Sequence, residues 1–243
     1  MKENNNFAIG VRDGVPICLG YLAVSFAFGI FAVGLGLSVP ETLLISMTNL
    51  TSAGQLAGAP IIATSGSLIE LAATQLIINL RYSLMSVSLS QKLGKSVKLR
   101  NRFLIGFGIT DEIFAVASSQ KGTVGKKYMY GLMLAPYFGW TLGTLIGALA
   151  GNILPAMVLS AFGVAIYGMF IAIVVPEAKK SKATALCVLS AIAASCLFKY
   201  APALNKVPSG TVIIICAVAV SAIFAWLAPI KPETEGGNEN ADN

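Results

Sequence analysis

Three charged residues inside long apolar stretches are the first candidates for chemistry: Arg81, Asp111 and Glu112. If these stretches cross a membrane, Arg81 lies about ten residues, or about 15 Å of helix, from the nearest basic loop. An arginine at such depth costs about 2.5–3.5 kcal/mol on insertion scales, so it usually pairs with an acid or lines a cavity. We therefore favour a functional role for Arg81; the alternative is that its side chain snorkels to the interface.

Asp111 and Glu112 are the natural partners of this arginine, because the other acids within apolar stretches, Glu41 and Glu70, stand near segment ends. We expect an Arg81–Asp111 or an Arg81–Glu112 pair. The alternative is that the segment carrying the acids is interfacial and that both acids are solvated.

Other polar residues complete the predicted substrate-binding or gating set: Gly54, Gln55, Asn79 and Thr110. Gln75, Asn79 and Tyr82 fall at i, i+4 and i+7, so they share one helix face and either bind a polar substrate or join helices. Arg81 lies about 200° around the same helix from Asn79. On a regular helix the two cannot both face one cavity.

A stripe of glycines at four-residue spacing predicts a close helix–helix contact. Its members are Gly139, Gly143, Gly147 and Gly151. The stripe indicates an interface that is either internal or formed with another subunit, and we expect a partner to dock there.

The sequence offers no catalytic, metal or cofactor pattern. It contains no histidine, which excludes His-based zinc sites and Ser-His hydrolases. Gly94-Lys95-Ser96 resembles the end of a phosphate-binding loop, but Leu89 stands where the first glycine belongs. We therefore expect neither an enzyme nor a bound cofactor or metal.

The composition shows which elements must position these residues. Of 243 residues, 56% are hydrophobic and 12% are charged, about half the usual charged share of a soluble domain. This excludes a soluble domain, a disordered chain and a nucleic-acid binder, and predicts an all-α membrane protein in a lipid bilayer. We expect one helical domain over 1–230 and a polar, disordered tail over 231–243. The apolar stretches are 14–37, 40–63, 67–90, 103–119, 128–150, 156–175, 183–200 and 208–230.

The distribution of lysine and arginine sets the topology. The N-terminal arm and the connections 91–102, 120–127 and 176–182 are basic, whereas 38–41, 60–66 and 151–155 carry no lysine or arginine. The positive-inside rule places the basic group in the cytoplasm, both termini included. Simple alternation then fails unless 40–63 and 103–119 are broken or re-entrant segments. We predict six full spans plus these two; the alternative is seven or eight plain spans.

Three patches of sequence together carry a family resemblance. One is the run Gly20–Gly29 followed by Gly36-Leu37-Ser38. Another combines Ala53-Gly54-Gln55 with Asn79-Leu80-Arg81, and the last is the run Gly108–Ala115. The chain resembles the AzlC family over roughly residues 10–175, and the Thr110-Asp111-Glu112 patch is the most specific part.

This resemblance implies the large subunit of a two-component exporter of branched-chain amino acids (leucine, isoleucine, valine and analogues such as azaleucine) in the plasma membrane. It also implies a small, hydrophobic AzlD-type partner. Tyr82 stands where the family commonly has histidine, so a proton-coupling role for that histidine cannot operate here. The alternatives are a secondary transporter or channel for another small solute, and a membrane subunit that does not transport.

Overall fold

The computed structural model describes residues 3–151 and 181–228 except 203 and 205; between 152 and 180 it describes only 153, 155, 157, 171, 174–176, 178 and 179. Within these residues the chain is helical and forms no strand, which confirms the all-α prediction. The chain folds into two compact units, Met1–Ile173 and Val174–Asn243. The proposed tail, 231–243, lies outside the described residues, and the single domain 1–230 stays a prediction.

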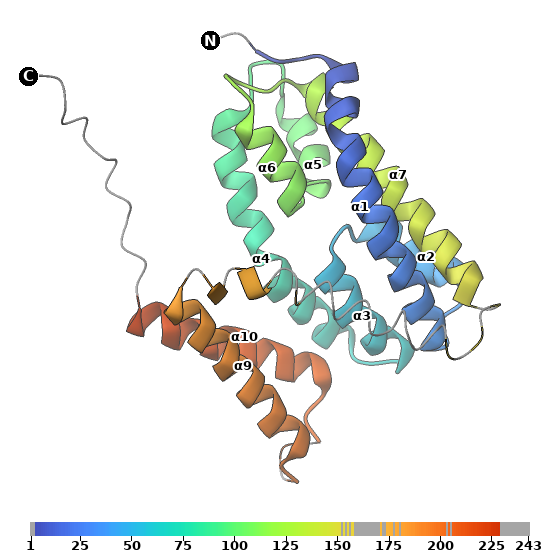
Figure 1. Ribbon diagram of the computed structural model, residues 1–243, viewed down its shortest axis with the longest axis vertical. Coiled ribbons are helices and arrows are strands. Elements are labelled where there is room, and N and C mark those ends of the chain that lie inside the picture. The colour runs from blue at the N-terminus through green and yellow to red at the C-terminus, as the bar shows by residue number, and fades with distance from the viewer. Residues whose placement is uncertain are drawn as a thin grey trace, which may run out of the picture. The chain divides into compact units, whose positions relative to one another are not determined.

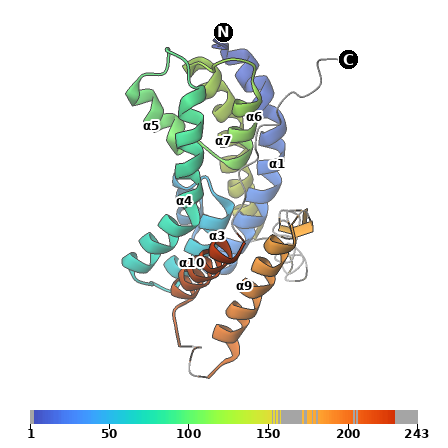
Figure 2. The same ribbon diagram turned by 90° about the vertical axis from the view of Figure 1, so that its left-hand side faces the viewer.

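Two long helices form the framework of the first unit. The helices α1 (Phe7–Gly34) and α7 (Lys126–Gly151) lie side by side and run in the same direction (Figures 1 and 2). Glycines let the two backbones approach closely: a Cβ on Gly143 would overlap the carbonyl oxygen of Leu22, and one on Gly147 would overlap that of Phe26. The helix α1 ends shortly before Gly36, whose φ of 90° favours glycine.

The glycine stripe therefore has an internal partner. Cβ atoms on Gly139 and Gly151 would also meet α1, at Cys18 and Val33. The close contact that the stripe predicts is confirmed, but the expectation that another subunit docks there is wrong. Sequence spacing shows that a helix must pack on the glycines, yet it does not identify that helix, because α1 and α7 are separated by about 90 residues of sequence.

The apolar stretch 40–63 is broken into a helical hairpin, as expected. It forms α2 (Val39–Thr48) and α3 (Ser52–Ala63), joined at Asn49–Thr51. Ser38 and Glu41 form a capping box at the start of α2, and the hydrogen bonds from Ser38 lower the pKa of the Glu41 carboxyl group. The side chain of Thr51 caps α3 by accepting a hydrogen bond from the Gly54 N–H.

A second hairpin follows the long helix α4 (Leu68–Lys92). It consists of α5 (Leu99–Phe107) and α6 (Asp111–Ser119), and its break falls within the predicted segment 103–119. Thr110 caps α6 by accepting a hydrogen bond from the Ile113 N–H. Both predicted broken segments are therefore present, and in each a threonine side chain begins the returning helix.

The basic loops meet at one end of this unit, here called the basic end. It comprises the N-terminal arm and the connections around 91–98 and 120–127. Main-chain hydrogen bonds join them: Asn4 N–H to the Thr123 carbonyl oxygen (2.8 Å), Gly125 N–H to that of Asn4 (2.7 Å) and Gly94 N–H to that of Val124 (2.8 Å). The α5–α6 hairpin starts and ends here, whereas the α2–α3 hairpin follows the far end of α1 (Figure 1). This arrangement agrees with the re-entrant topology.

The second unit is a pair of apolar helices, α9 (Lys182–Tyr200) and α10 (Ser209–Leu227), which pack against each other. The Ser195 hydroxyl donates to Cys216 Sγ at 3.7 Å between them. Most of their described side chains are exposed within the chain, a composition suited to lipid.

Among the described residues, four helices are long and apolar enough to cross a membrane: α1, α7, α9 and α10. The predicted span 67–90 is the 25-residue helix α4, which carries Arg81 and is not among the four. The predicted span 156–175 falls almost entirely outside the described residues. The membrane-embedded helical fold is thus confirmed, and the number of six full spans stays a prediction.

Candidate functional site

A cavity of about 710 Å³ lies where the two hairpin breaks approach α1, α4 and α7. The α2–α3 break contributes Leu50, Ser52 and Ala53 to its wall, and the α5–α6 break contributes Thr110, Asp111 and Glu112. Its volume lies within the range of about 300–1,000 Å³ that is usual for small-molecule sites. Non-helical backbone within a membrane is tolerated where protein surrounds it or where it lines a water-filled cavity. The two hairpin breaks, which line this cavity, meet that condition.

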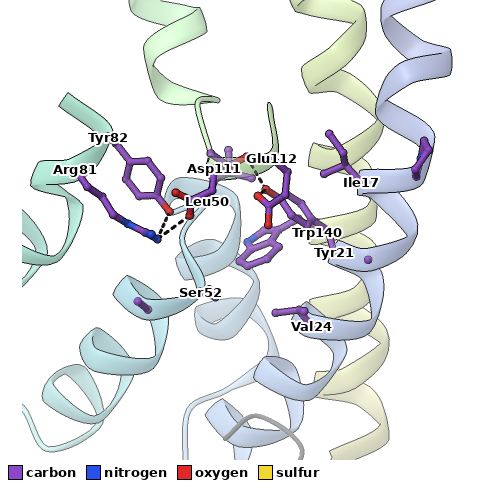
Figure 3. A pocket seen from close by; sticks show the side chains of 14 residues that line it. Ile17, Tyr21, Val24, Leu50, Ser52, Arg81, Tyr82, Asp111, Glu112 and Trp140 are labelled. Carbon is purple, nitrogen blue, oxygen red and sulfur yellow. Dashed lines mark hydrogen bonds and ion pairs between the residues drawn. The ribbon is translucent and has the colours of Figure 1, made fainter. Parts of the chain in front are cut away.

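Arg81 reaches across one side of this cavity to Asp111 (Figure 3). Its Nη2 lies 2.9 Å from Asp111 Oδ2, so the predicted Arg81–Asp111 pair is confirmed. The same nitrogen donates to the Tyr82 hydroxyl at 3.0 Å, and the guanidinium carbon lies 4.8 Å from the centre of that ring. Both charged side chains remain nearly half exposed, at 46% and 42%, so a ligand can reach each of them.

Glu112 points to the opposite side of the cavity and pairs with Tyr21 of α1 (Figure 3). The Tyr21 hydroxyl lies 2.5 Å from Glu112 Oε2 and 2.5 Å from Thr110 Oγ1. The Tyr21 ring packs edge-on against Trp140 of α7, with ring centroids 5.0 Å apart. Of the two arginine pairings left open by the sequence, the structure thus selects Asp111 and gives Glu112 a different partner.

The N-termini of α3 and α6 both lie at the cavity, where helix dipoles favour negative charge. The first turn of α6 already holds two acids, Asp111 and Glu112. The first turn of α3, which presents Ser52 and Ala53, holds no acid. The cavity therefore offers an anion the guanidinium of Arg81 together with the acid-free N-terminus of α3, and offers a cation the carboxylates of α6.

Three predicted site residues do not line the cavity: Gly54, Gln55 and Asn79. Gln75 Nε2 donates to the Gly54 carbonyl oxygen at 2.8 Å, and its Oε1 accepts from the side-chain amides of Asn49 and Asn79, each at 3.1 Å. These amides hold the α2–α3 break against α4. The helical-wheel argument that Asn79 and Arg81 cannot face one cavity agrees with this placement.

Gln55 is fully buried between α3 and its neighbours. Its Nε2 donates to Ser46 Oγ at 2.8 Å, and Ser46 Oγ lies 2.6 Å from Thr144 Oγ1 of α7. This chain of bonds joins α3, α2 and α7. The geometry therefore gives Gln55 a packing role, and its predicted part in substrate binding has no support from the cavity.

The sequence interpretation missed Tyr21 and Trp140 as cavity residues. Neither carries charge, and both stand in strongly apolar runs, so no local contrast marks them. Tyr21 lies within the Gly20–Gly29 patch and Trp140 follows Gly139 of the stripe, and these neighbours were the available signals. Among the described residues no group of three or more His, Cys, Asp or Glu side chains is placed to hold a metal ion.

Comparisons with known proteins find relatives that are membrane proteins. The family described as AzlC protein matches residues 16–154, more than half of the chain. An uncharacterized membrane protein of Archaeoglobus fulgidus is 34% identical over 181 residues, which cover 74% of this chain and 79% of the relative. The inner membrane protein YgaZ of Escherichia coli K12 is 31% identical over 150 residues, covering 60% and 61% of the two chains. No solved structure matches.

Proposed function

The chain belongs to the AzlC family of membrane proteins, and from this premise we propose that it exports branched-chain amino acids as the large subunit of a two-component secondary transporter. The observation that carries the proposal is the Arg81–Asp111 pair on one side of the cavity, in which Nη2 and Oδ2 lie 2.9 Å apart. A zwitterion opens such a pair by giving its carboxylate to the guanidinium and its ammonium to the acid. The site thus exchanges an internal ion pair for two equivalent ion pairs with the substrate.

The remaining walls favour an aliphatic side chain. Ile17, Val24 and Leu50 line the cavity beside the charged groups. Burying apolar surface there contributes about 25 cal/mol per Å² removed from water, which favours leucine, isoleucine and valine over alanine or glycine. The hydroxyl of Ser52 and the α3 N-terminus add further donors for the carboxylate.

The setting of this transporter is also part of the proposal. We place it in the plasma membrane with the basic end, and therefore the N-terminus, in the cytoplasm. The family resemblance implies a small AzlD-type hydrophobic subunit. That subunit must bind elsewhere than at the glycine stripe, which α1 already covers.

Counterflow of radiolabelled leucine in proteoliposomes tests the proposal. The protein is purified with its small partner, and vesicles loaded with unlabelled leucine should accumulate label. Arg81→Ala and Asp111→Asn should each abolish accumulation, because each removes a ligand for one end of the zwitterion. Arg12→Ala is the matched control, since Arg12 pairs with Asp13 at 3.4 Å outside the cavity.

Competition with other solutes defines the substrate class. Unlabelled isoleucine and valine should compete with leucine, whereas leucine amide and isocaproate, each lacking one charged group, should not. Failure of all branched-chain amino acids to drive counterflow would overturn the assignment. Counterflow with a different solute would point instead to a transporter for that solute.

A further inference from the structure

Two acids, Asp111 and Glu112, are among the described residues that line the cavity. Asp111 pairs with Arg81, so Glu112 has no cationic partner in this lining. The titratable groups of this lining are Tyr21 from α1, Arg81 and Tyr82 from α4, and Asp111 and Glu112 from α6. The α3 and α7 faces contribute Ser52, Ala53 and Trp140, which do not titrate. With Arg81 offset by Asp111, an ionised Glu112 leaves the cavity with one negative charge.

A single negative charge within a membrane protein is costly, and the usual ways to remove it are a counter-ion or a proton. Glu112 has Tyr21 as its hydrogen-bond partner, a neutral side chain at 2.5 Å. Arg81 lies across the cavity with its Nη2 bonded to Asp111 and Tyr82. Glu112 therefore contacts no cation among the described residues of the lining, and a proton is the remaining way to remove its charge.

The hydroxyl groups beside Glu112 can satisfy both of its protonation states. Tyr21 has one O–H proton but lies 2.5 Å from two oxygens, Glu112 Oε2 and Thr110 Oγ1. When Glu112 is ionised, Tyr21 donates to it and accepts the hydroxyl proton of Thr110. When Glu112 is protonated, it donates to Tyr21, and Tyr21 donates to Thr110. Reversing the donor and acceptor roles in these two hydrogen bonds therefore accommodates the proton, and Glu112 needs no new partner.

We propose that Glu112 is the proton-binding residue that couples amino-acid export to the proton gradient, with Tyr21 as its positioning residue. This inference rests on the proposed function, because it identifies the coupling ion of the same cavity. Binding of one proton converts the Glu112 carboxylate to the neutral acid and brings the net charge of the empty cavity to zero. Release of the proton on the other side of the membrane restores the carboxylate.

Two measurements on the same proteoliposomes test this coupling. Leucine counterflow, with equal pH on both sides, reports binding and exchange alone. Net leucine flux driven by an imposed pH gradient reports coupling. Glu112→Gln mimics the protonated acid, so we expect its net leucine flux, measured relative to its own counterflow rate, to lose the stimulation by the pH gradient. Retention of that stimulation in Glu112→Gln would overturn the proposal, as would stimulation by a sodium gradient in place of the pH gradient.

Asp13→Asn provides a matched control. Asp13 Oδ2 accepts a hydrogen bond from the Tyr128 hydroxyl at 3.0 Å, a tyrosine–carboxylate contact between α1 and α7 that does not line the cavity. This variant should keep both counterflow and gradient-driven flux. Tyr21→Phe keeps the ring beside Trp140 but removes the hydroxyl; it should shift the pH profile of net flux relative to that of the wild type. An unshifted profile would remove Tyr21 from the mechanism.

Infrared difference spectroscopy decides the protonation of Glu112 without transport. Acid titration of the purified wild type should produce a protonated-carboxyl band that is missing from Glu112→Gln and retained in Asp13→Asn. If Glu112→Gln does not fold, the same band in the wild type should shift in Tyr21→Phe, because its hydrogen-bond partner is lost. Absence of leucine counterflow in the wild type would refute the proposed function, whereas absence of the band would refute the proton site alone.

Discussion

The two broken hairpins share one design but are held in different ways. The tip of each hairpin is the region around its break. At the α2–α3 tip, neutral hydrogen bonds fix the chain: Gln75 bonds to the Gly54 carbonyl oxygen. Gln55 bonds to Ser46, which in turn bonds to Thr144. The tip of α5–α6 is held at the cavity by the Arg81–Asp111 ion pair and by Tyr21. A ligand zwitterion competes for an ion pair but not for a buried amide. The comparison therefore separates a tip anchored by buried amides from one that the proposed substrate and proton would release.

The largest loss of stability is expected at the contact between α1 and α7, next to Thr144, to which the α2–α3 hairpin is bonded. Gly143→Ala places a methyl group in overlap with Ser25 Oγ and the Leu22 carbonyl oxygen, so α1 and α7 must separate. Overpacking of this kind costs about 1–3 kcal/mol or more, and we expect a marked loss of folded protein. Fluorescence-detected size-exclusion chromatography and thermal unfolding in detergent measure it.

Gly34→Ala is the control for this change, because a Cβ there has no atom within 4 Å among the described residues. It should be close to neutral. Equal stability of the two variants would show that the α1–α7 contact is not as close as described.

A smaller loss of stability is expected at the anchored tip itself. Gln75→Leu leaves the Gly54 carbonyl oxygen and the Asn49 side chain without their bonds to Gln75, and a stranded buried polar group costs about 1–3 kcal/mol. The unfolding temperature should fall, while the folded fraction keeps its affinity for leucine. Gln91→Leu, at an exposed position of the same helix, is the control. Loss of leucine affinity with unchanged stability would make Gln75 a substrate ligand and end the distinction between the tips.

The smallest effect on the protein is expected from single-cysteine substitutions, which test from which side of the membrane each hairpin enters the bilayer. In a variant lacking the four native cysteines, a cysteine at position 98, at the start of α5, should react with an impermeant reagent only from the cytoplasmic side. A cysteine at position 65, between α3 and α4, should react from outside. Labelling of position 98 in intact cells would contradict the re-entrant topology.

The sequence predicts the features that contrast with their surroundings. Arg81, Asp111 and the glycine-rich breaks stand out from apolar runs, so the ion pair and both hairpins could be inferred before any coordinates. Tyr21 and Trp140 could not, because their role depends on which helices lie beside the cavity. The same limit applies to Gly143 and Gln55, whose spacing and polarity show that they need a partner but not which partner. Local chemistry is visible in sequence, whereas long-range pairing is decided by packing.

The order of the elements in the first unit has an evolutionary and mechanical consequence. A long helix followed by a broken hairpin occurs twice, as α1 with α2–α3 and as α4 with α5–α6, and the two halves run in opposite directions (Figure 1). Inverted structural repeats of this kind are found in many secondary transporters. In such an arrangement, the inward-facing and outward-facing states can arise when the two repeats adopt each other's conformation. If these two repeats exchanged conformations, the cavity would open to the other side of the membrane, and the direction of net flow would follow the gradients of the transported solute and its coupling ion.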